Sequence, residues 1–167
     1  QEILRIAEAG AGLGIRRVKV TGGEPLVRKG VIQLIRKLTA IDGIQDVTMT
    51  TNGILLGGMA QELAASGLSS VNISLDTLDP VRFHRITRRD CFADVMKGIE
   101  AAGKSGLMVK LNCAVMEELC REDVLAFAEY SVKNGIPVRF IEMMPIGQGR
   151  KYHAMDNEEL LAVLSEE

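Results

Sequence analysis

The sequence predicts an α/β fold, an incomplete parallel βα barrel with five strands. Short segments rich in β-branched residues alternate strictly with segments whose apolar residues recur at helical spacing. Alternation of this kind indicates parallel strands joined by right-handed crossovers. The strands recur at intervals of roughly 30 residues, which fits single βα units of a barrel. The predicted strands are residues 18–21, 47–51, 71–75, 109–113 and 138–141.

The ends of the intervening helices are marked by glycines, prolines and capping side chains. An amphipathic helical pattern is already present at Gln1. Asp79 followed by Pro80 is typical of an N-cap and a first-turn proline, and Asp156 with Glu159 resembles a capping box. Three further helices are expected to end in left-handed glycine caps, at Gly67, Gly106 and Gly135.

Length and composition limit the class of protein. The 167 residues suffice for one domain with a core, because 47% of them are hydrophobic. A net charge of -2 argues against a general nucleic-acid binder. No apolar run approaches the roughly 20 residues of a membrane span, and no secretory leader is visible. An odd number of cysteines without close pairs predicts a reduced, cytoplasmic protein; they are Cys91, Cys113 and Cys120.

The most distinctive segment is Thr21-Gly22-Gly23-Glu24-Pro25, directly after the first predicted strand. Its two glycines leave bare backbone that a ligand can approach closely, and its proline stops the strand. Glu24 adds a negative charge beside that backbone. The combination suits a zwitterionic head group, such as the ammonium and carboxylate of an amino acid.

A second functional signal is the alternation of polar and apolar side chains within the strands. Parallel sheets covered on both sides are usually apolar on both faces. Here one face is apolar and the other is polar in all five predicted strands. A curved sheet with a polar concave face is suited to hold a large polar ligand. This face carries three cations, at Lys19, Lys110 and Arg139.

Two interpretations of the cations and of the turn after the second strand stay open. The cations are either neutralised by carboxylates or converge on a polyanion such as a triphosphate. The candidate neutralising carboxylates are Glu24, Asp76 and Glu142. Thr50-Thr51-Asn52-Gly53 is either a common Asx-type turn or a polar lining at the mouth of the barrel.

Taken together and in order, these segments resemble the radical S-adenosylmethionine (SAM) enzymes. Within that superfamily they are most similar to the GTP 3',8-cyclase family of molybdenum cofactor biosynthesis. The glycine turn is general to the superfamily, whereas Arg139-Phe140-Ile141-Glu142, followed by Met143, Met144 and Pro145, is more specific to the cyclases. The other matching segments are residues 50–53, 72–76 and 109–113, so the resemblance covers nearly all of the chain.

The resemblance implies a set of ligand contacts. SAM is expected to bind at Gly23, Glu24, Ser74 and Met144, and GTP at Lys19, Thr50, Lys110 and Arg139. Lys19 stands where the family often has arginine, so the charge is kept but a bidentate grip is lost. In the family, a reduced [4Fe–4S] cluster cleaves SAM, and the resulting 5'-deoxyadenosyl radical takes a hydrogen from the ribose of GTP. The sugar radical then attacks C8 of guanine. No acid–base pair is needed for the hydrogen transfer, so no catalytic side chain is assigned.

The chain departs from the family pattern in its cysteines. The family holds one cluster on a CxxxCxxC motif after its first strand and a second on three cysteines beyond the barrel, and neither set is present here. Residues 1–167 are therefore interpreted as a single domain, the central part of the barrel, without the first strand and its cluster loop and without the C-terminal cluster region. No metal ligand is expected in this chain, and the isolated chain is expected not to turn over GTP.

The expected partners of this interpretation are GTP, SAM, an electron donor and the cyclic pyranopterin synthase that takes the product, without nucleic acid or membrane. An unpaired edge at the strand 18–21 also predicts a homodimer. Three alternatives remain: another radical SAM enzyme such as a peptide maturase, a non-radical phosphate-binding βα-barrel enzyme, and a non-catalytic nucleotide-binding module. The three cations favour a phosphorylated substrate over a peptide, and the glycine turn disfavours an ordinary phosphosugar barrel.

Overall fold

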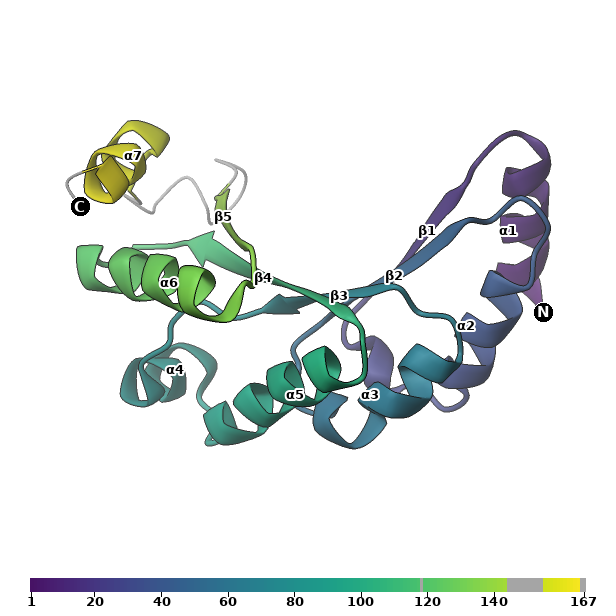
Figure 1. The fold of residues 1–167 in the computed structure, drawn as a ribbon, viewed down its shortest axis with the longest axis horizontal. Coiled ribbons are helices and arrows are strands. Elements are labelled where there is room, and N and C mark those ends of the chain that lie inside the picture. Colours follow the sequence, from purple (N-terminus) through teal and green to yellow (C-terminus); the bar gives the residue numbers. More distant parts are fainter. Residues whose placement is uncertain (118, 144–154, 166–167) are drawn as a thin grey trace. The chain divides into compact units, whose positions relative to one another are not determined.

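Helices and strands alternate along the described parts of the chain, except that a short 3₁₀ helix precedes the α-helix after the first strand and two helices lie between the third and fourth strands (Figure 1). The computed structural model describes residues 1–117, 119–143 and 155–165. In chain order the elements are α1 (Glu2–Gly12), β1 (Arg17–Val20), the short 3₁₀ helix η1 (Pro25–Val27), α2 (Val31–Thr39), β2 (Asp46–Thr51), α3 (Leu56–Ala65), β3 (Ser70–Ser74), α4 (Pro80–Thr87), α5 (Phe92–Lys104), β4 (Met108–Val115), α6 (Arg121–Asn134), β5 (Val138–Glu142) and α7 (Asn157–Ser165).

The strands belong to one sheet with the order β1-β2-β3-β4-β5. The pairs β1–β2, β2–β3 and β4–β5 are parallel. The predicted fold class is therefore confirmed, and each predicted strand is present with a shift of one or two residues at its ends. No described helix combines the length and the hydrophobicity that crossing a bilayer requires.

By its internal contacts the chain divides into two compact units. The first unit comprises residues 1–73 and 93–109, and the second comprises residues 74–92 and 110–167.

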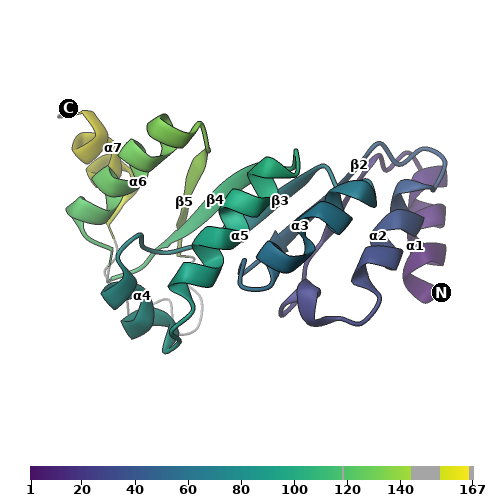
Figure 2. The same cartoon turned by 60° about the horizontal axis from the view of Figure 1, so that its bottom comes forward.

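In the first unit, α2, α3 and α5 cover the same face of the strands (Figures 1 and 2). Burial alternates along β2 as its sequence predicts, because Val47 and Met49 are fully buried, whereas Thr48 and Thr50 are half-buried. Ile35 of α2 is also completely buried in this core. α5 approaches the loop after β2 so closely that a Cβ atom on Gly98 would lie 2.5 Å from the carbonyl oxygen of Gly53. This contact holds the end of β2 against the helix layer.

The second unit has its core between β4, β5 and α6. Leu111 and Cys113 of β4 and Phe127 of α6 are completely buried. Phe127 meets Phe140 of β5 edge to face, with ring centroids 6.0 Å apart. This geometry is the favoured one for aromatic pairs.

The predicted helix ends are also confirmed. The side chain of Asp79 accepts a hydrogen bond from the N–H of Arg82, with Pro80 in the first turn of α4. Asp156 and Glu159 exchange the two reciprocal bonds of a capping box before α7, at 2.9 and 2.8 Å. The three predicted glycine caps have positive φ angles, at Gly67, Gly106 and Gly135.

Candidate functional site

The glycine turn after β1 is exposed and is followed by a carboxylate that points back into the protein. Gly22 has a φ of +151°, a backbone conformation that residues other than glycine rarely adopt. A Cβ atom on Gly22 or on Gly23 would meet nothing within 4 Å. Glu24 is half-buried and caps η1 by accepting a hydrogen bond at Oε1 from the N–H of Leu26, at 3.0 Å.

The same carboxylate also reaches the end of β2. Thr51 Oγ1 donates a hydrogen bond to Glu24 Oε1 at 2.7 Å, and the N–H of Asn52 donates to Glu24 Oε2 at 2.7 Å. Thr51 Oγ1 in turn accepts from the N–H of Gly53 at 3.1 Å, and Asn52 Oδ1 accepts from the N–H of Ile54 at 3.0 Å. The Asx-type turn, one of the two interpretations of residues 50–53 left open by the sequence, is therefore present. We call Glu24, Thr51 and Asn52 the carboxylate clamp.

Two of the expected GTP residues also lie in the first unit. Lys19 on β1 is exposed and is in register with Thr48. Thr50 on β2 is half-buried and is in register with Asn72 of β3. Neither faces the buried helix side of its strand, as the alternation predicted.

The second unit carries three more of the expected ligand residues. Ser74 ends β3 and is exposed, Lys110 on β4 is half-buried, and Arg139 on β5 is exposed. Arg139 is in register with Asn112, whose Oδ1 atom is buried and accepts no hydrogen bond among the described residues. None of the ion pairs formed by residues 1–117, 119–143 and 155–165 involves the three cations of the polar face. Within these ranges the three cations are therefore not paired with the candidate carboxylates Glu24, Asp76 and Glu142.

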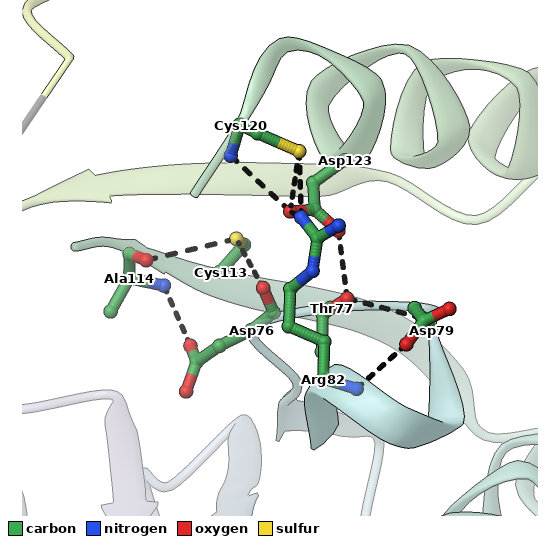
Figure 3. A network of polar contacts seen from close by, with 8 residues as sticks. All are labelled: Asp76, Thr77, Asp79, Arg82, Cys113, Ala114, Cys120 and Asp123. Carbon is green, nitrogen blue, oxygen red and sulfur yellow. Dashed lines mark hydrogen bonds and ion pairs between the residues drawn. The ribbon is translucent and has the colours of Figure 1, made fainter. Parts of the chain in front are cut away.

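Asp76 lies just beyond β3 and is anchored to β4. Its Oδ1 atom accepts a hydrogen bond from the N–H of Ala114 at 2.8 Å (Figure 3). Burial raises the pKa of Asp76 above its ordinary value, and the bond from Ala114 partly opposes this rise. The neighbouring thiol of Cys113 is completely buried, and burial together with the charges of Asp76 and Asp123 strongly raises its pKa. Cys113 is therefore an inert core residue.

A polar network joins the start of α4 to the start of α6 within the second unit (Figure 3). Its centre is Asp123, which is only 4% exposed. Asp123 forms an ion pair with Arg82 and accepts a hydrogen bond from Thr77 Oγ1 at 2.7 Å. The N–H of Cys120 donates to the same carboxylate at 3.3 Å, and Arg82 Nη1 donates to Cys120 Sγ at 2.6 Å. This network fixes the loop that follows the expected SAM residue Ser74.

The structure thus describes seven of the eight expected ligand residues, four in the first unit and three in the second. The eighth, Met144, lies outside the described residues. Sequence reasoning included Thr51 only as part of the turn 50–53 and did not predict its bond to Glu24. The signal was present, because a threonine occupies the buried parity after Val47 and Met49, where a hydrophobic residue is expected.

The described residues do not form a metal site. The three cysteines are free thiols, and no group of three His, Cys, Asp or Glu side chains within the described ranges is arranged to hold a metal. A [4Fe–4S] cluster needs thiolate ligands, so the cysteines of this chain do not fit one.

Comparisons of sequence identify relatives of the chain. A profile of the Radical SAM superfamily matches residues 1–131. The GTP 3',8-cyclase of Clostridium perfringens (strain SM101 / Type A) is 43% identical over 166 residues, which are 99% of this chain and 51% of that protein. The GTP 3',8-cyclase of Heliobacterium modesticaldum is 50% identical over 150 residues, covering 89% of this chain and 46% of that protein. The chain therefore spans about half the length of the curated relatives it matches.

Comparisons of structure agree on the fold. Streptococcus suis SuiB bound to S-adenosylmethionine superposes with a TM-score of 0.79 at 18% identity, over 98% of this chain and 39% of that one. Methylornithine synthase (PylB) superposes with a TM-score of 0.74 at 15% identity, over 98% of this chain and 51% of that one. The exposed glycine turn, the polar strand faces and the superfamily profile lead to one assignment: this chain belongs to the radical SAM superfamily.

Proposed function

We propose that the protein containing this sequence is a GTP 3',8-cyclase that uses SAM to cyclise GTP in molybdenum cofactor biosynthesis. The observation that carries the proposal is the alignment of a named cyclase along 99% of the chain at 43% identity. The cations on the polar strand faces, which form no ion pair with another described residue, support it, because a triphosphate needs positive charge and a peptide substrate does not.

The proposed SAM contacts are Gly23, Glu24, Ser74 and Met144. An exposed turn without side chains lets the amino-acid part of SAM approach the backbone N–H and C=O groups closely. The exposed hydroxyl of Ser74 is available for a further hydrogen bond. Bound SAM supplies the hydrogen-abstracting chemistry of this superfamily, and the residues of the chain hold and orient it.

The proposed GTP contacts are Lys19, Thr50, Lys110 and Arg139. The three cations form none of the ion pairs of the described residues, so their charge is available to phosphate oxygens. Arg139 is the residue suited to bidentate phosphate binding, whereas the two lysines act as point charges. The cysteines of this chain do not fit the ligand set of a [4Fe–4S] cluster.

The proposed partners follow from the same assignment. They are an electron donor, the cyclic pyranopterin synthase that takes the product, and a second copy of the protein. Cytoplasmic location is proposed because all three cysteines are free thiols.

The test is anaerobic incubation of the native protein that contains this sequence with GTP, SAM and a one-electron reductant. We expect GTP-dependent release of 5'-deoxyadenosine together with a cyclised nucleotide, both followed by chromatography and mass spectrometry. Release that is equal with GTP, ATP and no nucleotide would contradict the proposal. The 167-residue chain alone is expected to be inactive in the same assay, and turnover by it would contradict the interpretation of the missing cluster ligands.

Variants of the cations test the substrate site separately. Lys110→Met is expected to weaken GTP binding about tenfold, the effect of losing one charged hydrogen bond, without changing SAM binding. Lys104→Met is the matched control, because Lys104 is exposed and pairs with Glu100 one helical turn away. Lys19→Arg is expected to strengthen GTP binding severalfold by restoring a bidentate contact. Calorimetry with GTP, GDP and ATP measures all three, and equal affinities in Lys110→Met and wild type would refute the assignment of Lys110.

A further inference from the structure

Thr51 is a polar residue at a buried, core-facing position. Only 2% of its surface is exposed, and it follows Val47 and Met49 on the helix-facing side of β2. Its hydroxyl makes two hydrogen bonds, because it donates to Glu24 Oε1 and accepts from the N–H of Gly53. A valine has the same shape and also suits a strand. The hydroxyl is therefore explained by its two bonds and not by packing.

The carboxylate of Glu24 accepts hydrogen bonds from the protein's own backbone and from the side chain of Thr51. Oε1 accepts from Leu26 and Thr51, and Oε2 accepts from the N–H of Asn52. Hydrogen bonds to an ionised carboxylate are roughly twice as strong as neutral ones. The clamp thus fixes Glu24 to a strand end 27 residues later in the chain.

The glycine turn has little else to hold it. Both glycines are exposed, and the space around their Cβ positions is empty to 4 Å. Their backbone position therefore depends on the anchored residue that follows them. Because the proposed SAM contact is made by this backbone, the clamp determines where the ligand-binding groups point.

We propose that Thr51 is a positioning residue for SAM that acts through Glu24 on the Gly22–Gly23 turn. This inference rests on the proposed use of SAM by the protein. Thr51 does not touch the ligand. Its hydroxyl keeps the carboxylate of Glu24 in place, and the carboxylate keeps the turn in the conformation that receives the amino-acid part of SAM.

The experiment compares a graded series at one position in the native, anaerobically prepared protein. Thr51→Ser keeps the hydroxyl, Thr51→Cys keeps the volume with a weak donor, and Thr51→Val keeps the shape with no donor. Equilibrium dialysis with labelled SAM and with labelled GTP gives the two affinities. We expect SAM binding to weaken about tenfold in Thr51→Val, less in Thr51→Cys and by less than twofold in Thr51→Ser, with GTP binding within twofold of wild type throughout.

The matched control is Thr39→Val. Thr39 also has a hydroxyl that donates to backbone carbonyls at 3.0 Å, but it lies at the C-terminal end of α2. Its loss removes a comparable hydrogen bond, and SAM affinity is expected to stay within twofold. Glu24→Ala provides the test of action through Glu24, because in that background Thr51→Val should weaken SAM binding no further.

Amide hydrogen exchange adds a readout that does not need SAM. Thr51→Val is expected to speed exchange at Leu26 and Asn52, whose N–H groups donate to Glu24, whereas Thr39→Val leaves these amides unchanged. Unchanged SAM affinity in Thr51→Val, equal losses for SAM and GTP, or additive losses with Glu24→Ala would each overturn the inference. A wild-type protein that binds no SAM would overturn the proposed function and this inference with it, and unchanged exchange in Thr51→Val would overturn the clamp alone.

Discussion

Replacing Asp123 by alanine removes the centre of the polar network in the second unit. The hydroxyl of Thr77, which is 1% exposed, then loses its acceptor, at a loss of about 1–2 kcal/mol for a buried unsatisfied group. The first turn of α6 loses the bond from the N–H of Cys120, worth about 1 kcal/mol as a cap. The side chain of Arg82 is 26% exposed, so water partly replaces the lost carboxylate. The ion pair therefore contributes little to the total, as exposed ion pairs do.

These contributions together predict that Asp123→Ala lowers the free energy of unfolding by about 3 kcal/mol. Urea unfolding of the native protein, followed by circular dichroism, measures the change. Asp94→Ala is the matched control, because Asp94 is also in the first turn of a helix but is exposed and lies 4.0 Å from Lys97. Its effect is expected to stay within about 0.5 kcal/mol.

A double-mutant cycle then tests the assigned partner. Thr77→Val alone is expected to lower stability by about 1 kcal/mol, and much less in the Asp123→Ala background, because its acceptor is already gone. Equal effects of Asp123→Ala and Asp94→Ala, or additive effects of Thr77→Val and Asp123→Ala, would refute the reasoning that this network holds the unit together.

Four further outcomes are expected. Gly98→Ala should lower stability by about 1–3 kcal/mol in thermal unfolding, because its Cβ would lie 2.5 Å from a carbonyl oxygen, whereas Gly103→Ala on the same helix, with nothing within 4 Å, should not. Asp76→Asn should raise the free energy of unfolding near pH 7 but not below pH 4. Because the pKa of Asp76 is raised in the folded protein, its contribution to stability is present in acid and is lost as the pH rises through that pKa. Urea unfolding at both pH values checks the sign. Cys113 should resist alkylation until the protein is unfolded, as mass spectrometry after iodoacetamide treatment at pH 8 will report, because its pKa is raised by burial. Association through the edge of β1 should raise the apparent mass with concentration in light scattering, and a constant monomer mass would exclude it.

Much of the fold follows from local chemistry that is legible in the sequence. β2 is predictable because Val47 and Met49 alternate with threonines, and α4 is predictable because Asp79 precedes Pro80. Such signals act over a few residues, where the backbone geometry is known in advance. The orientation of Lys19 and Thr50 away from the buried side of their strands also followed from parity, since it depends only on which face of a strand a residue occupies, whereas their role as GTP contacts was implied by the family resemblance alone.

The rest of the site depends on residues that meet only after folding. From the sequence, Asp123 is an ordinary acidic residue in the first turn of a helix. In the structure it is buried and forms an ion pair with Arg82, 41 positions earlier. From the sequence, Glu24 is a free charge next to bare backbone. In the structure its carboxylate accepts three hydrogen bonds, and two of the donors lie at the end of the next strand. No periodicity in the sequence encodes these partners, because the pairing is decided by crossover geometry and not by local spacing.

The bond between Glu24 and Thr51 has a consequence for how this motif tolerates change. Because the two side chains share this bond, the effect of a substitution at one position depends on the residue at the other, although 27 positions separate them. A library that randomises the glycine turn alone tests every replacement of Glu24 against an unchanged Thr51, so it misses replacements that need a different partner there. Randomising both positions together is the way to find other pairs that close the same turn.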